Sequence, residues 1–166
     1  MRYPLFLDLT NQSAVVIGAG NVAARKIRTL LRAKATVTVF SPQATASIRR
    51  LAQTKRVRWV RRLYHPGDLR DAYLVIAATY DLAVNQIVCQ EAKRRNLLVN
   101  CIAPPAWGNF IVPSLVRRDG ISLAISTDGA SPAFAKRLRH DLEHFLGDEY
   151  PQLLKAMSAV RRAKKA

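Results

Sequence analysis

Short apolar runs alternate with stretches of helical periodicity over the first two thirds of the chain. Residues 14–17 are apolar, and from residue 22 to about residue 33 apolar side chains recur at helical spacing. This pattern predicts a strand followed by an amphipathic helix. Residues 36–40 alternate and are rich in β-branched side chains, which is typical of a strand. Together the segments predict a βαβ unit with parallel strands.

The same alternation continues to the proline- and glycine-rich loop at residues 101–109. The pattern predicts helices over residues 44–54 and 81–95 and strands over residues 57–60, 73–78 and 97–100. Asp81 is the expected N-cap of the second of these helices. Residues 73–78 are apolar throughout, as in a strand buried on both faces of a parallel sheet. Residues 6–9 are expected to form a small edge strand.

A glycine turn joins the first predicted strand to its helix. Gly18, Gly20 and Ala23 give the spacing G-x-G-x-x-A, in which the first glycine permits a tight turn and the second leaves room for a pyrophosphate. The free N–H groups of the following helix favour an anion. The chain is therefore predicted to be α/β with a Rossmann-type parallel sheet that binds a dinucleotide. A domain of this type that has kept the turn and lost the ligand is the alternative.

The tip of the second predicted strand lacks an expected acid. Many NAD enzymes carry an acidic residue there for the ribose diol, whereas this chain has Ser41-Pro42-Gln43. No arginine stands at the strand tip to require a 2′-phosphate, so the sequence leaves NAD and NADP open. Nucleotide-sensing modules of potassium-transport regulators share the glycine turn, but they usually carry an acid at the position of Ser41.

The pattern changes after residue 109. Two β runs, residues 110–116 and 121–126, flank a hairpin signal at residues 118–120. Ser131 and Pro132 open a helix that ends near Gly147, and a last helix covers residues 151–163. This half has too little apolar surface to fold alone, so we expect it to pack against a second copy in a homodimer. The predicted parts are a Rossmann domain (residues 1–112), a strand–helix dimerisation region (113–148) and a small helical tail (149–166).

The chain is strongly basic, with 27 Lys and Arg against 11 Asp and Glu and a net charge of +16. Such a charge favours polyanionic partners. No helix-turn-helix and no basic motif interleaved with aromatic residues is recognisable, so we expect no nucleic-acid partner.

The sequence also predicts location and thiol state. It contains no run of about 18 apolar residues, so we expect no membrane span, and the N-terminus does not resemble a signal peptide. We therefore expect a cytoplasmic protein. Cys89 and Cys101 lack metal-ligand spacing, and we interpret them as small buried hydrophobic residues. No stable metal site is expected.

A set of motifs in a fixed order covers nearly the whole chain. They are Tyr3-Pro4-Leu5-Phe6, the turn with Arg25-Lys26, Ala77-Ala78-Thr79 with Val84-Asn85, Asn100, the segment 108–114 and the segment 126–132. The set resembles the precorrin-2 dehydrogenase/sirohydrochlorin ferrochelatase family, which includes the N-terminal module of siroheme synthase. The resemblance implies an intertwined homodimer and NAD-dependent oxidation of precorrin-2 to sirohydrochlorin. Some members also insert Fe²⁺ to give siroheme.

The resemblance also implies roles for individual residues. The tetrapyrrole would meet Asn100, Asn109, Thr127 and Ser131, and Thr127 stands where siroheme synthase has a serine that can be phosphorylated. The cofactor would be met by Gly18, Gly20, Asn21, Val22, Pro42, Gln43 and Thr79.

One departure from the family concerns its functional aspartate, which follows the fifth strand. That position is Ala103 here, followed by two prolines. Alanine neither accepts a proton nor helps to bring iron to the macrocycle, so we expect weak or no ferrochelatase activity, and the catalytic residue stays unknown. Asp128 is a candidate substitute, although a residue in the turn before Gly129 is the simpler interpretation. His140 is more simply explained as a surface residue.

Two functional hypotheses follow from the resemblance. The first is an NAD-dependent precorrin-2 dehydrogenase. The second, motivated by Ala103, is a tetrapyrrole-binding or regulatory protein on the same fold that carries out no catalysis.

Overall fold

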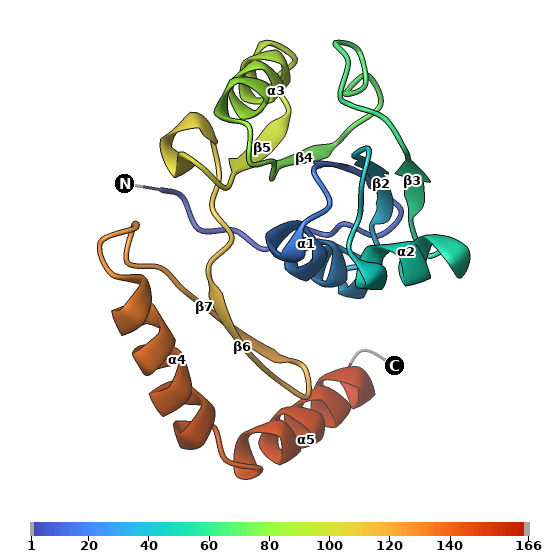
Figure 1. Cartoon of the computed structure of the whole chain (residues 1–166). Coiled ribbons are helices and arrows are strands. Elements are labelled where there is room, and N and C mark those ends of the chain that lie inside the picture. Colours follow the sequence, from blue (N-terminus) through green and yellow to red (C-terminus); the bar gives the residue numbers. More distant parts are fainter. Residues whose placement is uncertain (1, 165–166) are drawn as a thin grey trace. The chain divides into compact units, whose positions relative to one another are not determined.

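The structure, a computed structural model, describes residues 2–164 and divides into two compact units. Pro4–Ile111 form the first unit, and the second contains the described residues outside it, 2–3 and 112–164 (Figure 1). The predicted split of the second half into residues 113–148 and 149–166 stays a prediction.

A parallel five-stranded sheet forms the centre of the first unit. Its strands run in the order β3-β2-β1-β4-β5, so that β1 lies in the middle. The elements are β1 (Ser13–Ile17), α1 (Asn21–Arg32), β2 (Thr36–Phe40), α2 (Ala46–Gln53), β3 (Arg58–Val60), β4 (Leu74–Ala77), α3 (Leu82–Arg94), β5 (Leu98–Cys101) and a short 3₁₀ helix, η1 (Pro105–Trp107). The prediction of an α/β fold with a Rossmann-type parallel sheet is confirmed.

The strands bury side chains on both faces because helices cover both faces of the sheet. Val16 and Ile76 point into a core shared with α1 and α2, whereas the adjacent Val15 and Val75 point into a core shared with α3. Figure 1 shows α1 and α2 on one face and α3 on the other. All four residues of β4 are buried, as its continuous apolar run predicts.

The helix caps agree with the sequence where it carries a cap signal. The Asp81 carboxylate accepts hydrogen bonds from the amides of Ala83 (2.8 Å) and Val84 (3.2 Å), so it caps α3. The Ser131 hydroxyl accepts one from the amide of Phe134 (3.1 Å) at the start of the helix that follows it. Each bond satisfies a donor that the first helical turn leaves free.

Two strand predictions need correction. Residues 6–9 form no strand. Phe6 is exposed, and of these four side chains only that of Leu9 packs into the core, so the segment makes no strand-to-strand hydrogen bonds with the sheet. The strand predicted from residue 110 begins only at Ser114. Phe110 packs instead against the first unit's core, and Pro113 has no N–H with which to extend a ladder.

The second unit consists of a hairpin and two helices. The strands β6 (Ser114–Arg118) and β7 (Ile121–Ile125) pair antiparallel, and α4 (Pro132–Phe145) and α5 (Glu149–Ala163) follow. Asp119 and Gly120 both have positive φ (39° and 94°), as a two-residue turn between twisted strands requires. The core is small, with Val116, Ile125, Ala135 and Leu146 as its buried members.

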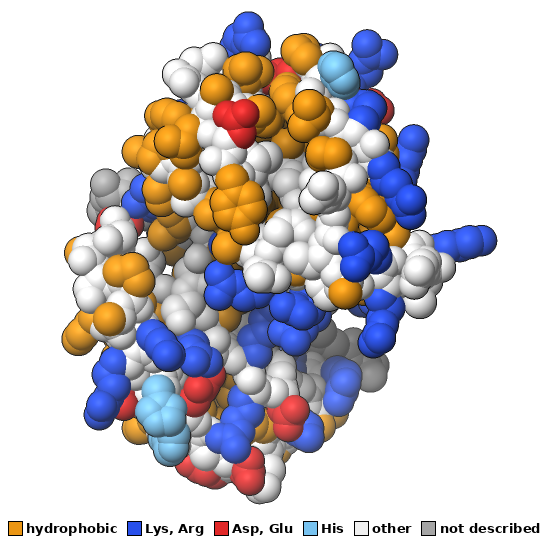
Figure 2. All heavy atoms as spheres, in the orientation of Figure 1, with side chains coloured by type: hydrophobic (Ala, Val, Ile, Leu, Met, Phe, Trp, Pro, Cys, Tyr) orange, Lys and Arg blue, Asp and Glu red, His pale blue; other side chains and the backbone are white. Residues whose placement is uncertain are grey.

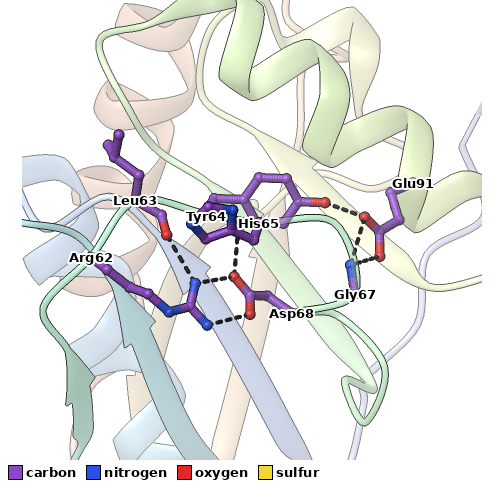
Figure 3. A network of polar contacts seen from close by, with 7 residues as sticks. All are labelled: Arg62, Leu63, Tyr64, His65, Gly67, Asp68 and Glu91. Carbon is purple, nitrogen blue, oxygen red and sulfur yellow. Dashed lines mark hydrogen bonds and ion pairs between the residues drawn. The ribbon is translucent and has the colours of Figure 1, made fainter.

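A polar network ties the loop between β3 and β4 to α3 (Figure 3). Glu91 is only 5% exposed, and its carboxylate accepts hydrogen bonds from the Tyr64 hydroxyl, the Gly67 amide (3.1 Å) and Arg95 Nε (2.9 Å). Burial, together with the bond to Glu91, raises the pKa of Tyr64 well above its usual value. The hydroxyl therefore stays protonated and donates to the carboxylate.

A second ion pair closes the same loop. Arg62 holds both oxygens of Asp68 at 2.6 and 2.7 Å, and this bidentate contact holds the pKa of Asp68 below its ordinary value of 3.8. Asp68 also accepts a hydrogen bond from the His65 amide (2.8 Å). Two carboxylates, those of Glu91 and Asp68, thus hold the first half of this loop, residues 62–68.

Replacing Glu91 tests how much this network stabilises the first unit. Glu91→Ala leaves the Tyr64 hydroxyl and the Gly67 amide without their acceptor, so we expect a loss of about 2–4 kcal/mol in the free energy of unfolding. Urea unfolding followed by tryptophan fluorescence measures it, because Trp59 and Trp107 both lie in this unit. The control is Asp71→Ala, an exposed carboxylate in the same loop, with an expected change within about 0.5 kcal/mol. Equal losses in the two variants would contradict a stabilising role for the network.

Candidate functional site

The turn after β1 is held by a close approach between two loops. The Gly18 amide donates to the Phe40 carbonyl (2.9 Å), and the Ala78 amide donates to the Ile17 carbonyl (2.8 Å). Gly18 has φ +102°, and a Cβ at this position would lie 2.3 Å from the Ala78 carbonyl oxygen. Only glycine fits, for reasons of both conformation and space.

The N-terminus of α1 is open for an anion. Gly20 is its N-cap, no side chain caps the helix, and its first turn contains no acid. The nearest neighbour of a Cβ at Gly20 would be the Tyr80 side chain, at 3.4 Å. Free amides, the helix dipole and a residue without a side chain together suit a pyrophosphate. Asn21 and Val22, two of the predicted cofactor residues, begin the helix at this point; their contact with a cofactor stays a prediction.

A buried amide ties together the loops that follow β4 and β5. Asn85 has no exposed surface. Its Oδ1 accepts from the Thr79 amide (3.1 Å), and its Nδ2 donates to the carbonyls of Thr79 (3.1 Å) and Ala103 (3.2 Å). The Thr79 hydroxyl lies 2.8 Å from the same Oδ1. Asn85 thereby positions Thr79, the predicted cofactor residue.

Sequence reasoning assigned no role to Asn85 or to Tyr80. A polar amide on the buried face of α3 was the available signal for Asn85. Tyr80 follows Thr79 and is 94% exposed, with its hydroxyl beside Gly20. An exposed aromatic residue next to a glycine turn is a candidate to contact a bound nucleotide.

At the tip of β2 the chain presents no carboxylate. The Ser41 hydroxyl donates to the Gln43 carbonyl (2.7 Å), and Trp59 Nε1 of β3 donates to the Ser41 carbonyl (2.9 Å). Pro42 and Gln43 are exposed. The loop is therefore held from within and leaves these two side chains accessible.

The two asparagines near β5 differ in what their amides do. Asn109 pairs with the strand backbone: its Oδ1 accepts from the Val99 amide and its Nδ2 donates to the Leu97 carbonyl, both at 2.8 Å. Asn100 is 6% exposed and donates to the Phe110 carbonyl (3.1 Å). Within the described residues its Oδ1 is buried without a hydrogen-bond partner, so Asn100 retains a free acceptor.

The loop after β5 contains Ala103 and lies close to the two cysteines. The Ala103 carbonyl accepts from Asn85 and from Cys101 Sγ (3.3 Å), and the residue is half-buried. Cys89 and Cys101 are free and each 2% exposed. Burial, with Cys101 beside it, raises the pKa of Cys89 to about 12. Both thiols are the buried residues that the sequence predicts.

In the second unit, the side chain of Thr127 contacts the backbone of Ser131, and both are predicted substrate residues. Thr127 Oγ1 lies 3.2 Å from both the amide and the carbonyl oxygen of Ser131. Asp128 has φ +51° and forms an exposed ion pair with Arg2 at 3.2 Å. This arrangement favours the turn interpretation of Asp128.

The histidines of α4 are exposed and contact each other. The ring of His140 lies 4.2 Å from that of His144, edge to face, and His144 Nδ1 is 2.9 Å from the His140 carbonyl oxygen. In the part of the chain that the structure describes, no three His, Cys, Asp or Glu side chains are grouped so as to hold a metal ion. No helix within residues 2–164 has both the length and the apolar character of a membrane span.

The fold and the glycine turn define a dinucleotide-binding domain of the Rossmann type. An NAD(P)-binding family model matches residues 5–114, and the family model for the central part of sirohaem biosynthesis proteins matches residues 118–144. The chain belongs to the family of precorrin-2 dehydrogenases and siroheme synthase N-terminal modules, as its motifs suggested.

Three relatives illustrate this membership. A precorrin-2 dehydrogenase of Bacillus subtilis (strain 168) is 30% identical over 97% of this chain and 99% of its own length. A siroheme synthase of Mannheimia succiniciproducens is 37% identical over 95% of this chain but only 32% of its own length. The chain thus spans about a third of that relative. The solved structure of SirC, a precorrin-2 dehydrogenase, is 34% identical with a TM-score of 0.81, covering 93% of this chain and 76% of SirC.

Gly20→Ala tests the opening at α1. The nearest atom to the added methyl group is the Tyr80 hydroxyl oxygen, at 3.4 Å, so the variant should fold, with a melting temperature only slightly lowered by alanine at the N-cap. The methyl group would occupy the space of a pyrophosphate and remove charged hydrogen bonds, so we expect NADH affinity to fall at least about tenfold. NADH fluorescence titration and thermal denaturation measure the two effects. Gly18→Ala is the contrasting variant and should lose stability itself. Wild-type NADH affinity in Gly20→Ala would place the cofactor elsewhere.

Proposed function

We propose that this protein oxidises precorrin-2 to sirohydrochlorin with NAD as the hydride acceptor. The observation that carries this proposal is its similarity to the Bacillus subtilis precorrin-2 dehydrogenase, which extends over nearly the whole of both chains. The open glycine turn supports it, because the reaction needs a bound nicotinamide nucleotide. The activity is proposed for this chain alone, whatever further activities its longer relatives have.

The cofactor would be held at the carboxyl edge of the sheet. Gly18 and Gly20 shape the turn. The free backbone amides of Asn21 and Val22, at the start of α1, would face the pyrophosphate. Pro42 and Gln43 would meet the adenosine half and Thr79 the nicotinamide half. When bound, NAD supplies the hydride chemistry, and the protein's task is to position the two reactants.

The substrate carries many carboxylates, and the basic surface suits them. Figure 2 shows Lys and Arg side chains, in blue, outnumbering acidic ones on the visible face. The buried Oδ1 of Asn100 has no partner among the described residues, so a ligand N–H, such as that of a pyrrole, would satisfy it. Asn109, Thr127 and Ser131 remain proposed substrate residues whose polar groups also support their own loops.

The proton that accompanies hydride loss has no fixed carboxylate acceptor at position 103. Ala103 presents a methyl group where the family has an aspartate, so we propose that water accepts this proton, at a cost in rate. Iron insertion would require a group that attracts the cation to the macrocycle. We therefore expect dehydrogenation to exceed any insertion of iron, which would be a substrate here.

Anaerobic turnover of precorrin-2 with NAD tests the activity. We expect the wild-type protein to produce the absorbance of sirohydrochlorin. Ala103→Asp restores a base and should raise the rate at least about tenfold, since a well-placed general base contributes roughly 10²–10⁴-fold. Ala106→Asp places the same acid at an exposed position of the same loop and should leave the rate unchanged.

Two results would count against this proposal. Turnover in Ala103→Asp but not in the wild-type protein would favour a tetrapyrrole-binding or regulatory role. If neither protein produced sirohydrochlorin although both bound NADH, precorrin-2 would be excluded as the substrate.

We also propose that the protein is a cytoplasmic homodimer. Large apolar side chains of the second unit are exposed, among them Phe134 (59%), Phe145 (64%) and Met157 (63%). A second copy would cover such surface, which a monomer rarely exposes. The free thiols of Cys89 and Cys101 suit a reducing compartment.

Light scattering after size exclusion tests the dimer. The mass of the wild-type protein measured by light scattering should be twice the monomer mass. Phe134→Glu would bury a charge in the interface and should raise the dimer dissociation constant at least about tenfold. Lys136→Glu places the same acid about 200° around α4 and serves as the control. A monomeric wild-type protein at micromolar concentration would contradict the homodimer.

A further inference from the structure

Tyr80 lies beside the opening of the glycine turn, in the loop between β4 and α3, and is 94% exposed. Apart from the chain neighbours of Gly20, its hydroxyl oxygen, Cε2 and Cζ are the heavy atoms nearest to the point that a Cβ on Gly20 would occupy. They lie 3.4, 3.7 and 3.8 Å from it. Since Gly20 is the N-cap of α1, the edge of the phenol ring faces the helix end that is open for an anion.

The backbone is held on both sides of Tyr80. The Thr79 amide donates to Asn85 Oδ1 (3.1 Å), and the Thr79 hydroxyl lies 2.8 Å from the Asp81 carbonyl oxygen. The Asp81 carboxylate in turn accepts from the amides of the first turn of α3. The loop therefore fixes where the Tyr80 side chain starts, while the exposed ring is left free to turn.

The phenol adds a side-chain donor to a site that otherwise offers backbone amides. Among the described residues no side chain caps α1, and its first turn contains no acid. A tyrosine hydroxyl donates a hydrogen bond without bringing a charge. Hydrogen bonds to an ionised phosphate oxygen are about twice as strong as those between neutral groups. The Tyr80 hydroxyl can therefore strengthen the binding of a pyrophosphate from the loop after β4.

The ring must move when such a ligand binds. A pyrophosphate against Gly20 would take the space beside which the Tyr80 hydroxyl now lies. Because the ring is exposed, rotation about its two side-chain torsions breaks few protein contacts and costs little conformational entropy. The phenol can then lie over the ligand instead of blocking its place.

We propose that Tyr80 covers the bound dinucleotide and that its hydroxyl donates a hydrogen bond to the pyrophosphate. This inference rests on the proposed binding of NAD at the glycine turn. Tyr80 is then a binding residue that holds the middle of the cofactor in place. It takes no part in the transfer of the hydride or of the proton.

Calorimetric titration of the full chain with NAD and with ADP-ribose tests the proposal, because ADP-ribose contains the pyrophosphate and lacks the nicotinamide. Tyr80→Phe keeps the ring and removes the donor. It should weaken the binding of both ligands at least about tenfold, the usual cost of a hydrogen bond to a charged group. Tyr73→Phe is the matched control: this residue is also exposed but precedes β4, at the opposite end of that strand. It should alter neither affinity.

A second variant removes the ring as well as the hydroxyl. Tyr80→Ala should weaken the binding of both ligands at least as much as Tyr80→Phe does. Because the Tyr80 side chain is exposed, both variants should keep a melting temperature close to that of the wild-type protein. Tighter binding in Tyr80→Ala would mean that the ring obstructs the turn, and it would overturn the inference.

The outcomes separate this inference from the proposed function. Unchanged affinities in Tyr80→Phe, with both ligands bound by the wild-type protein, would overturn the inference and leave the dehydrogenase standing. A loss confined to NAD would place the contact at the nicotinamide and would also overturn it. Failure of both ligands to bind the wild-type protein would overturn the proposed cofactor function as well.

Discussion

The contact between Gly18 and Ala78 is the constraint on which the candidate site depends. The connections that leave the paired strands β1 and β4 approach so closely that a Cβ on Gly18 would lie 2.3 Å from the Ala78 carbonyl oxygen. The approach fixes where the chain turns after β1, and therefore where α1 begins and what its free amides face. It also fixes the start of the loop that carries Thr79 and Tyr80. A larger residue at Gly18 would displace both halves of the site together.

Buried amides extend this constraint to the rest of the edge. An asparagine side chain is uncharged and both donates and accepts, so it can be buried at a cost that its hydrogen bonds offset, whereas a lone carboxylate cannot. Asn85 uses these properties to join the loops after β4 and β5, and Asn109 pairs with the backbone of β5. Asn100 differs, because its buried Oδ1 has no partner among the described residues. Side-chain amides therefore hold the loops after β4 and β5 in place, and Asn100 keeps hydrogen-bonding capacity that the described residues do not use.

The sequence predicted the elements better than the contacts between them. Periodicity located the five parallel strands, the hairpin and the helices, and side-chain chemistry identified the caps Asp81 and Ser131. It was wrong at residues 6–9, where an apolar run of strand length packs by a single side chain. The roles of Asn85 and Glu91 were not visible, because each side chain contacts a loop residue 18 to 27 residues away in the sequence. Local patterns record which face of an element is buried, and they contain no information on which distant loop that face will meet.

The shortage of carboxylates at the edge of the sheet affects binding and chemistry in opposite directions. Ser41, Ala103 and the first turn of α1 are all places where an acid would repel an anionic ligand, and none is present. At an effective dielectric constant of 20, two like charges 4 Å apart repel by about 4 kcal/mol, so each missing acid favours a polyanionic cofactor or substrate. The same absence removes a fixed proton acceptor. Hydride transfer depends mainly on positioning, and water can accept the accompanying proton, whereas metal insertion must attract a cation and remove protons from the macrocycle. An edge of this composition therefore suits dehydrogenation of an anionic tetrapyrrole better than chelation.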